Sequence, residues 1–184
     1  MRKFFYLIIS LIFFSSFGIM GKLFAKNKGG KTMGIQSSAF KNGGLIPSKH
    51  SYNGGNVSPP LEWSSVPEEV KSFTLICDDP DAPAGTWVHW VYYNIPPEIR
   101  SLPEKVALNK KPAQGGMQGS NDFSKIGYGG PCPPSGTHRY FFKIYALDSM
   151  LALSAGAIKK ELLKAMEGHI LSKAELMGKY KKRK

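Results

Sequence analysis

Three segments of the chain alternate between apolar and other residues in the way that β-strands do. They are 72–79 (SFTLICDD), 87–94 (WVHWVYYN) and 139–147 (RYFFKIYAL). Because successive side chains of a strand point to opposite faces, this period of two predicts sheets that turn one face to a core. The Gly- and Pro-rich stretches between the segments predict short, ordered loops. The pattern favours a mostly β fold, an antiparallel β-sandwich.

Helical spacing is found only near the C-terminal end of the chain. Apolar residues recur at intervals of three and four across 158–166, and Ser154 is placed to cap the N-terminus of that helix. A second short helix is predicted for about 169–177, where Gly178 would end it. The expected architecture is therefore a sandwich followed by short C-terminal helices.

The first 25 residues have the layout of a secretory signal. The segment 1–25 begins with basic residues and continues with an apolar run over 4–20, and small residues occur near its end. The run is near the shortest length that crosses a bilayer, so an uncleaved N-terminal anchor stays open. We expect an exported protein, periplasmic or secreted, or held at the inner membrane if the signal is not cleaved. The remaining divisions are a linker (26–34), a single domain (35–180) and a basic tail (181–184).

Composition narrows the class of protein. The 184 residues suffice for one domain with a core, and 25 Lys and Arg against 13 Asp and Glu give a net charge of +12. The positive charge is spread out rather than concentrated on a basic helix, so we expect anionic ligands and no nucleic-acid partner. Two cysteines exclude a disulfide framework and a four-cysteine zinc module. No P-loop, dinucleotide fingerprint or zincin motif occurs, and no cofactor is expected.

Polar residues interrupt the predicted strands at their ends. Asp79 continues the parity of the apolar residues in its strand, and His138 precedes the third strand. His89 has the parity of Trp87, Val91 and Tyr93. In antiparallel neighbours the end of one strand lies beside the start of the next. We therefore expect the aspartate and the two histidines to meet at one rim of the sandwich.

Several motifs around these residues resemble one known family. They are DPDAP at 79–83, WVHW at 87–90 and GGPCPPSGTHRY at 129–140, which look like the two signature regions of the phosphatidylethanolamine-binding protein family. The stretch QGSNDF at 118–123, with GYGGPCPP and the closing LSKAELMGKY, resembles its bacterial Raf-kinase-inhibitor-like (YbhB/YbcL) branch. The resemblance covers about 34–180.

This resemblance implies a β-sandwich with a small pocket for phosphate, phosphorylated or carboxylate head groups, including a lipid head group. Imidazole and tyrosine hydroxyl donors suit phosphate oxygens. Arg139 has the opposite parity to its neighbours, and we expect it in a structural ion pair with a carboxylate. No residue is assigned as catalytic or as a metal ligand. Matched by motif, the ligand-binding residues would be Asp79, Asp81, Pro83, Trp87, His89, Gly130, Pro131, His138 and Tyr140.

Other interpretations stay open beside the binding protein. A protein-interaction module that inhibits a protease or a signalling partner is one alternative. A hydrolase that uses Cys132 or Ser135 with His138 is another, which the residues support less strongly. Two histidines and two aspartates could hold zinc, but no short ligand pair supports such a site. Cys77 and Cys132 could form a disulfide or remain free thiols. A second copy of the chain could also be a partner, in a homodimer.

Overall fold

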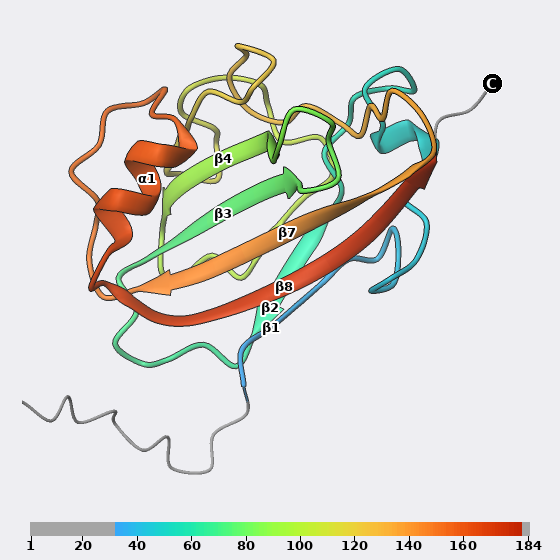
Figure 1. The fold of residues 1–184 in the computed structure, drawn as a ribbon. Helices are drawn as coiled ribbons and strands as arrows, with labels where there is room; N and C mark the ends of the chain where they lie inside the picture. Colours follow the sequence, from blue (N-terminus) through green and yellow to red (C-terminus); the bar gives the residue numbers. More distant parts are fainter. Residues whose placement is uncertain (1–31, 182–184) are drawn as a thin grey trace, which may run out of the picture. The chain divides into compact units, whose positions relative to one another are not determined.

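Two antiparallel sheets make up the protein in the computed structural model, which describes residues 32–181. The predicted signal or anchor (1–25), most of the predicted linker and residues 182–184 lie outside the described residues. The mostly β prediction is confirmed (Figure 1). The larger sheet has the order β6 (Met117–Gln118), β4 (Trp87–Ile95), β3 (Ser72–Asp79), β7 (Thr137–Leu147) and β8 (Ile170–Lys181). The smaller sheet has the order β1 (Gly34–Gln36), β2 (Leu61–Ser64) and β5 (Ser101–Leu102).

The central strands of the larger sheet are covered on both faces. One face packs against the small sheet in a core that includes Leu75, Phe142 and, from β2, Trp63. The opposite face packs against the helical segment in a second core that includes Ile76 and Leu162. All residues of β3 are buried as a result. Because β3 is buried on both faces, the position of its ends is fixed by packing. The predicted polar residue Asp79 lies at one of these ends.

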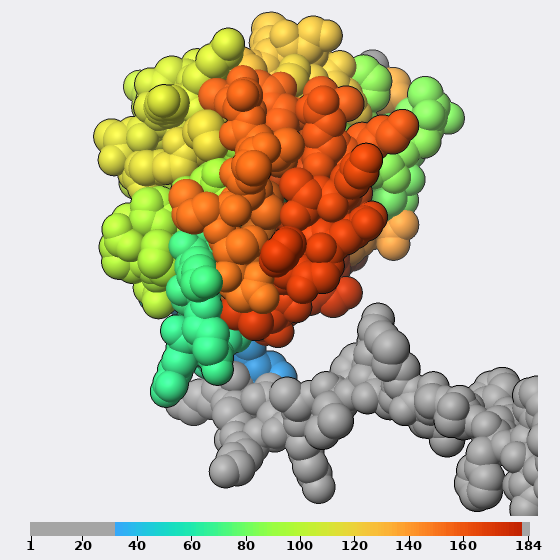
Figure 2. All heavy atoms as spheres, turned by 90° about the vertical axis from the view of Figure 1, so that its left-hand side faces the viewer, coloured from blue at the N-terminus to red at the C-terminus, as the bar shows by residue number. Residues whose placement is uncertain are grey.

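The region after β7 contains α1 (Lys159–Met166), the one α-helix among residues 32–181. It begins at Lys159, and not directly after the predicted cap at Ser154, because Glu161 reaches back to accept the Ile158 N–H at 3.0 Å. Leu162 and Met166 point into the second core. Figure 2 looks onto this side of the molecule, where α1 and its flanking segments form a continuous surface in orange and red.

The second predicted helix is wrong, because residues 170–181 form the long edge strand β8 (Figure 1). Leu, Lys, Ala and Glu are good helix formers, which explains the prediction from local sequence. The segment instead pairs with β7 along its whole length and turns Leu176 and Gly178 inward. Lys181, assigned to the basic tail, is the last residue of this strand. A short 3-10 turn, η1 (Ser48–His50), lies before the small sheet's second strand.

Within residues 32–181 no helix has the length and hydropathy needed to cross a membrane.

Candidate functional site

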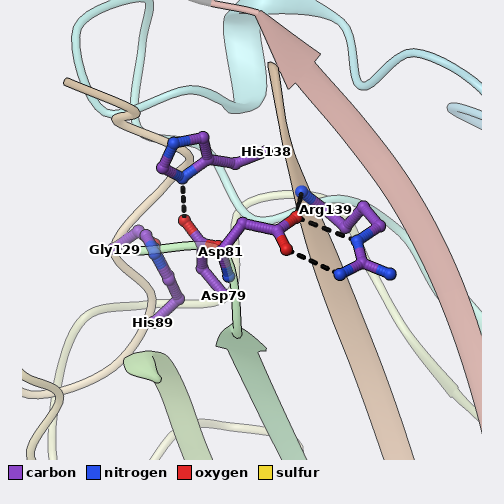
Figure 3. Close-up of polar contacts among 6 residues, drawn as sticks. All are labelled: Asp79, Asp81, His89, Gly129, His138 and Arg139. Atoms are coloured by element: carbon purple, nitrogen blue, oxygen red, sulfur yellow. Dashed lines mark hydrogen bonds and ion pairs between the residues drawn. The ribbon is translucent and has the colours of Figure 1, made fainter. Parts of the chain in front are cut away.

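Asp79 and His138 meet at one rim of the larger sheet. Asp79 is the last residue of β3 and lies opposite Trp87, the first residue of β4. The Nδ1 atom of His138, near the start of β7, is 2.7 Å from Oδ2 of Asp79 (Figure 3). Both side chains are buried. This contact joins the end of one strand to the beginning of its antiparallel neighbour, as the alternation predicted.

His89 also lies at this rim, although for a different reason from the one predicted. The ladder between β3 and β4 shifts register at this residue, which is the mark of a β-bulge. The ring centroid of His89 is 5.1 Å from that of Tyr140, whereas Val91 and Tyr93 pack in the second core. The predicted common face is therefore wrong for Val91 and Tyr93, because the bulge breaks the strict alternation, whereas the rings of Trp87 and His89 both contact that of Phe123.

A cavity of about 320 Å³ opens beside these residues. Its walls come from the loop between β3 and β4, the start of β4 and the long loops that precede β7. Asp79, His89 and Cys132 are the lining residues with ionisable side chains, and the rest of the lining is apolar apart from the Trp87 indole N–H. The lining residues are Asp79, Ala82, Pro83, Ala84, Trp87, His89, Phe123, Cys132 and Pro134.

Two buried donors at this place have no hydrogen bond of good geometry. They are the indole Nε1 of Trp87 and the hydroxyl of Tyr140. Burial, together with the nearby Asp79 carboxylate, raises the pKa of Tyr140, so its hydroxyl keeps its proton at neutral pH. Buried donors are rarely left without a partner in folded proteins. An acceptor from outside the chain would satisfy the Trp87 indole, whereas the Tyr140 hydroxyl already lies beside the Asp79 carboxylate and the Cys132 backbone.

His89 is oriented by the backbone of the loop that follows it in space. Its Nδ1 lies 2.7 Å from the carbonyl oxygen of Gly129, so this nitrogen carries the proton and donates it. Burial lowers the pKa of His89, which makes the ring neutral at pH 7. The second nitrogen, Nε2, is left for a ligand of the cavity.

Asp81 is held away from the cavity by Arg139 (Figure 3). The guanidinium donates to both carboxylate oxygens, at 2.6 and 2.9 Å, and the Arg139 backbone N–H adds a bond of 2.9 Å. These hydrogen bonds and the positive charge of Arg139 lower the pKa of Asp81 to about 2. The backbone N–H of Asp81 donates to Oδ1 of Asp79 at 2.8 Å. Asp81 thus acts on the rim by positioning Asp79, rather than by lining the cavity.

Gly130 and Pro131 lie behind the cavity wall. The Gly130 N–H donates to Oδ1 of Asn56 at 2.7 Å, and the Pro131 carbonyl accepts from the Tyr52 N–H at 3.0 Å. Both residues are buried and neither lines the cavity, although Cys132, further along the same loop, does. The two predicted ligand-binding residues therefore anchor the loop that carries the wall.

Phe123 is the main lining residue that sequence reasoning did not assign. It comes from the loop after β6, where Oδ1 of Asn121 accepts its backbone N–H at 3.0 Å. Its ring stacks on Tyr52 at 4.7 Å and meets Trp87 and His89 edge-on, at 5.4 Å in both cases. No periodicity marks a loop aromatic, so the only available signal was its position in the family-like stretch 118–123.

The two cysteines are free thiols. Cys77 is buried in the core, and burial raises the pKa of its thiol, whereas Cys132 is exposed at the cavity. Neither Cys132 nor Ser135 is hydrogen-bonded to His138, whose Nδ1 is engaged by Asp79. Within residues 32–181 no three His, Cys, Asp or Glu side chains come together in a way that could hold a metal ion. The geometry does not favour an activated nucleophile.

Comparison with known proteins decides the family. The family model described as phosphatidylethanolamine-binding protein matches residues 36–181. The chain belongs to the phosphatidylethanolamine-binding protein family. This confirms the membership predicted from the signature motifs and supports a role as a binding protein of that family.

The relatives of this family member span the same domain. A UPF0098 protein of Methanothermobacter thermautotrophicus is 52% identical over 150 residues, which are 82% of this chain and 99% of that protein. The structure of CT736, a phosphatidylethanolamine-binding protein homologue of Chlamydia trachomatis, matches with a TM-score of 0.75 and 44% identity, over 83% of this chain and 99% of that one. Escherichia coli YbcL matches with a TM-score of 0.77 and 33% identity, over 83% and 100% of the two chains.

Proposed function

We propose that the rim cavity binds a small anion: phosphate, or the phosphorylated or carboxylate head group of a larger molecule. The observation that carries this proposal is a pair of buried donors beside a cavity that His89 also lines: Trp87 Nε1, which has no hydrogen-bond partner among the described residues, and Tyr140 Oη, which lies next to the Asp79 carboxylate and the Cys132 backbone. Oxygens of an anion would accept hydrogen bonds from such donors, and bonds to a charged acceptor are about twice as strong as neutral ones.

The charge balance of the rim is compatible with an anion. Asp79 would repel one if it stood alone, but it accepts the Nδ1–H of His138 and the backbone N–H of Asp81. These two hydrogen bonds offset part of the negative charge of the Asp79 carboxylate. His89 is neutral in the free protein and gains a proton when a negative charge arrives beside it.

The size and the apolar walls of the cavity indicate that the ligand has an organic part beside its anionic group. Its volume of about 320 Å³ is at the lower end of the range for ligand sites. The polar groups lie at the rim, whereas Pro83, Phe123 and Pro134 form apolar walls. An anion with a short organic part fits this division between polar and apolar surface better than a bare ion. A phosphomonoester such as phosphoethanolamine is a suitable probe.

Calorimetric titration of the full chain with phosphate and with phosphoethanolamine tests the proposal. Tyr140→Phe removes one hydroxyl and no other atom, and it should weaken binding about tenfold or more, because a hydrogen bond to a charged group contributes about 1.5–3 kcal/mol. His138→Ala should weaken binding at least as much. Tyr92→Phe is the matched control, because its hydroxyl donates to the Gly115 carbonyl at 2.6 Å, away from the cavity.

Each result has a definite meaning. Binding that is lost in Tyr140→Phe and kept in Tyr92→Phe supports the anion site. Equal binding by the parent and Tyr140→Phe would show that the ligand sits elsewhere. No binding of either probe by the parent would refute the proposal and leave a protein partner as the alternative function.

A further inference from the structure

A second groove lies over the neighbouring strands β7 and β8, on the face of the larger sheet that also carries α1 (Figure 1). Its volume is about 480 Å³, within the usual range of ligand sites, and none of its lining residues belongs to the rim cavity. The β7–β8 register places Lys143 opposite Glu175 and Tyr145 opposite Lys173. Ala174 packs against the first core on the opposite face, so its backbone forms part of the groove. The groove therefore combines a floor of paired strands with charged walls.

Lys143 does not neutralise Glu175, although the register places the two residues opposite each other. The ammonium of Lys143 donates to Oδ1 of Asp78 at 2.8 Å, and Lys159 of α1 bonds to the second oxygen of this carboxylate. The Asp78 side chain is only 1% exposed. Taking one partner away from a buried charge is strongly destabilising, so Lys143 is held toward β3. The negative charge of Glu175 is therefore left for another partner.

Lys173 and Glu175 give the groove opposite charges at two points along β8. Both residues are exposed, and among the residues that the structure describes neither has an ion-pair partner. Two positions along a strand separate them by about 7 Å. Tyr145 stands beside Lys173, and burial raises the pKa of its hydroxyl, which therefore remains a proton donor at neutral pH. One part of the groove thus offers two donors and a positive charge, and the other part offers a carboxylate.

We propose that this groove binds a small zwitterion, a dipeptide with free termini. Its carboxylate accepts hydrogen bonds from Lys173 and Tyr145, and its ammonium donates to Glu175. An extended dipeptide covers two strand positions, so its terminal charges are about as far apart as the two charged residues of β8. A simple anion would be repelled by Glu175 and a simple amine by Lys173, so the groove selects a ligand that carries both charges.

Nuclear magnetic resonance titration of the isotope-labelled full chain with alanyl-alanine tests this site. The backbone amide signals of residues 173–175 should shift and saturate in the millimolar range. Two modified probes each lack one terminal charge: N-acetyl-alanyl-alanine has no ammonium, and alanyl-alanine amide has no carboxylate. Each should bind about two- to fivefold more weakly than alanyl-alanine, because an exposed ion pair contributes up to about 1 kcal/mol.

Two variants assign each terminal charge of the probe to its residue. Glu175→Gln should bind alanyl-alanine and its N-acetylated form equally, because the partner of the ammonium is gone. Lys173→Gln should bind alanyl-alanine and its amide equally, because the partner of the carboxylate is gone. Glu167→Gln and Lys164→Gln are the matched controls, since they make the same changes at exposed residues outside the groove, and they should bind all three probes like the parent.

Thermal melting checks that the variants are folded, which is expected because Lys173 and Glu175 are exposed. A preference that disappears only in the matching variant supports the site. Amide signals of residues 173–175 that do not respond to alanyl-alanine, or preferences that persist in both variants, overturn the proposal. Phosphate, the probe of the rim cavity, should not displace the dipeptide at constant ionic strength. Displacement would place the dipeptide in the rim cavity and overturn the proposal as well.

Discussion

Replacing Gly130 by alanine tests whether the cavity loop is anchored as described. An added Cβ at this position would lie 2.3 Å from the His50 carbonyl oxygen and 2.6 Å from backbone atoms of Ser51 and Tyr52. All three neighbours belong to the main chain and cannot turn aside as a flexible side chain can. The loop must move by roughly 1 Å to restore ordinary van der Waals contact.

The cost of this movement can be bounded. Overpacking a filled site costs about 1–3 kcal/mol, and the rigid neighbours here place Gly130→Ala at the upper end. The shift also strains the bond from the Gly130 N–H to Asn56, now 2.7 Å long. Alanine restricts the unfolded chain and returns about 0.5 kcal/mol. The net loss of unfolding free energy should be about 2–3 kcal/mol, or a fall in melting temperature of about 4–12 °C for a chain of this size.

Urea denaturation, with anion titration of the folded variant, measures both consequences. Gly34→Ala is the matched control, because its new Cβ would meet only the Ser64 hydroxyl oxygen, at 3.8 Å. We expect Gly34→Ala to change stability by less than about 0.5 kcal/mol. Gly130→Ala should also weaken phosphate binding, since Cys132 and Pro134 of the same loop line the cavity. Equal stability of the two variants would refute the close packing behind the loop.

Three further predictions concern other parts of the molecule. A thiol reagent should label Cys132 in the native protein and Cys77 only after unfolding, because one is exposed and the other buried in the core. Asp78→Asn should lower the unfolding free energy in urea by about 2 kcal/mol, since this buried carboxylate holds two lysines, one on β7 and one on α1. Sulfate should bind more tightly as pH falls below 7, by at most about tenfold per unit for one proton, because burial lowers the pKa of His89 and the bound anion raises it again.

Each of these predictions has its own control. No labelling of the native protein would indicate that the two thiols are joined or covered. Asp148→Asn, which removes a carboxylate from an exposed pair with His169, should leave stability almost unchanged, and an equal effect of the two asparagine variants would contradict the role of Asp78. Sulfate does not titrate in this pH range, so tightening that persists unchanged in His89→Gln would assign the proton to another group.

The candidate site was partly predictable from local patterns. Asp79 and His138 could be placed together because Asp79 ends one alternating strand and His138 lies near the start of another. Antiparallel pairing brings these two positions side by side. Phe123 could not be placed, because its position depends on an Asn121 turn and on stacking against Tyr52, which is distant in sequence. That Asp81 pairs with Arg139 instead of lining the cavity could not be predicted either, since only the folded loop brings its carboxylate to Arg139.

The amino-acid sequence by itself determined the family, the β class and the three long strands of the sheet core, because their alternation is a local property that survives in any register. Only the tertiary structure decided the state of residues 170–181 and the face on which His89 lies. Helix propensities differ by tenths of a kcal/mol per residue, which the ladder with β7 and the burial of Leu176 outweigh. The bulge likewise leaves one residue of β4 unpaired. The sequence of β4 does not indicate this bulge, because a register is defined only by pairing with the neighbouring strand β3.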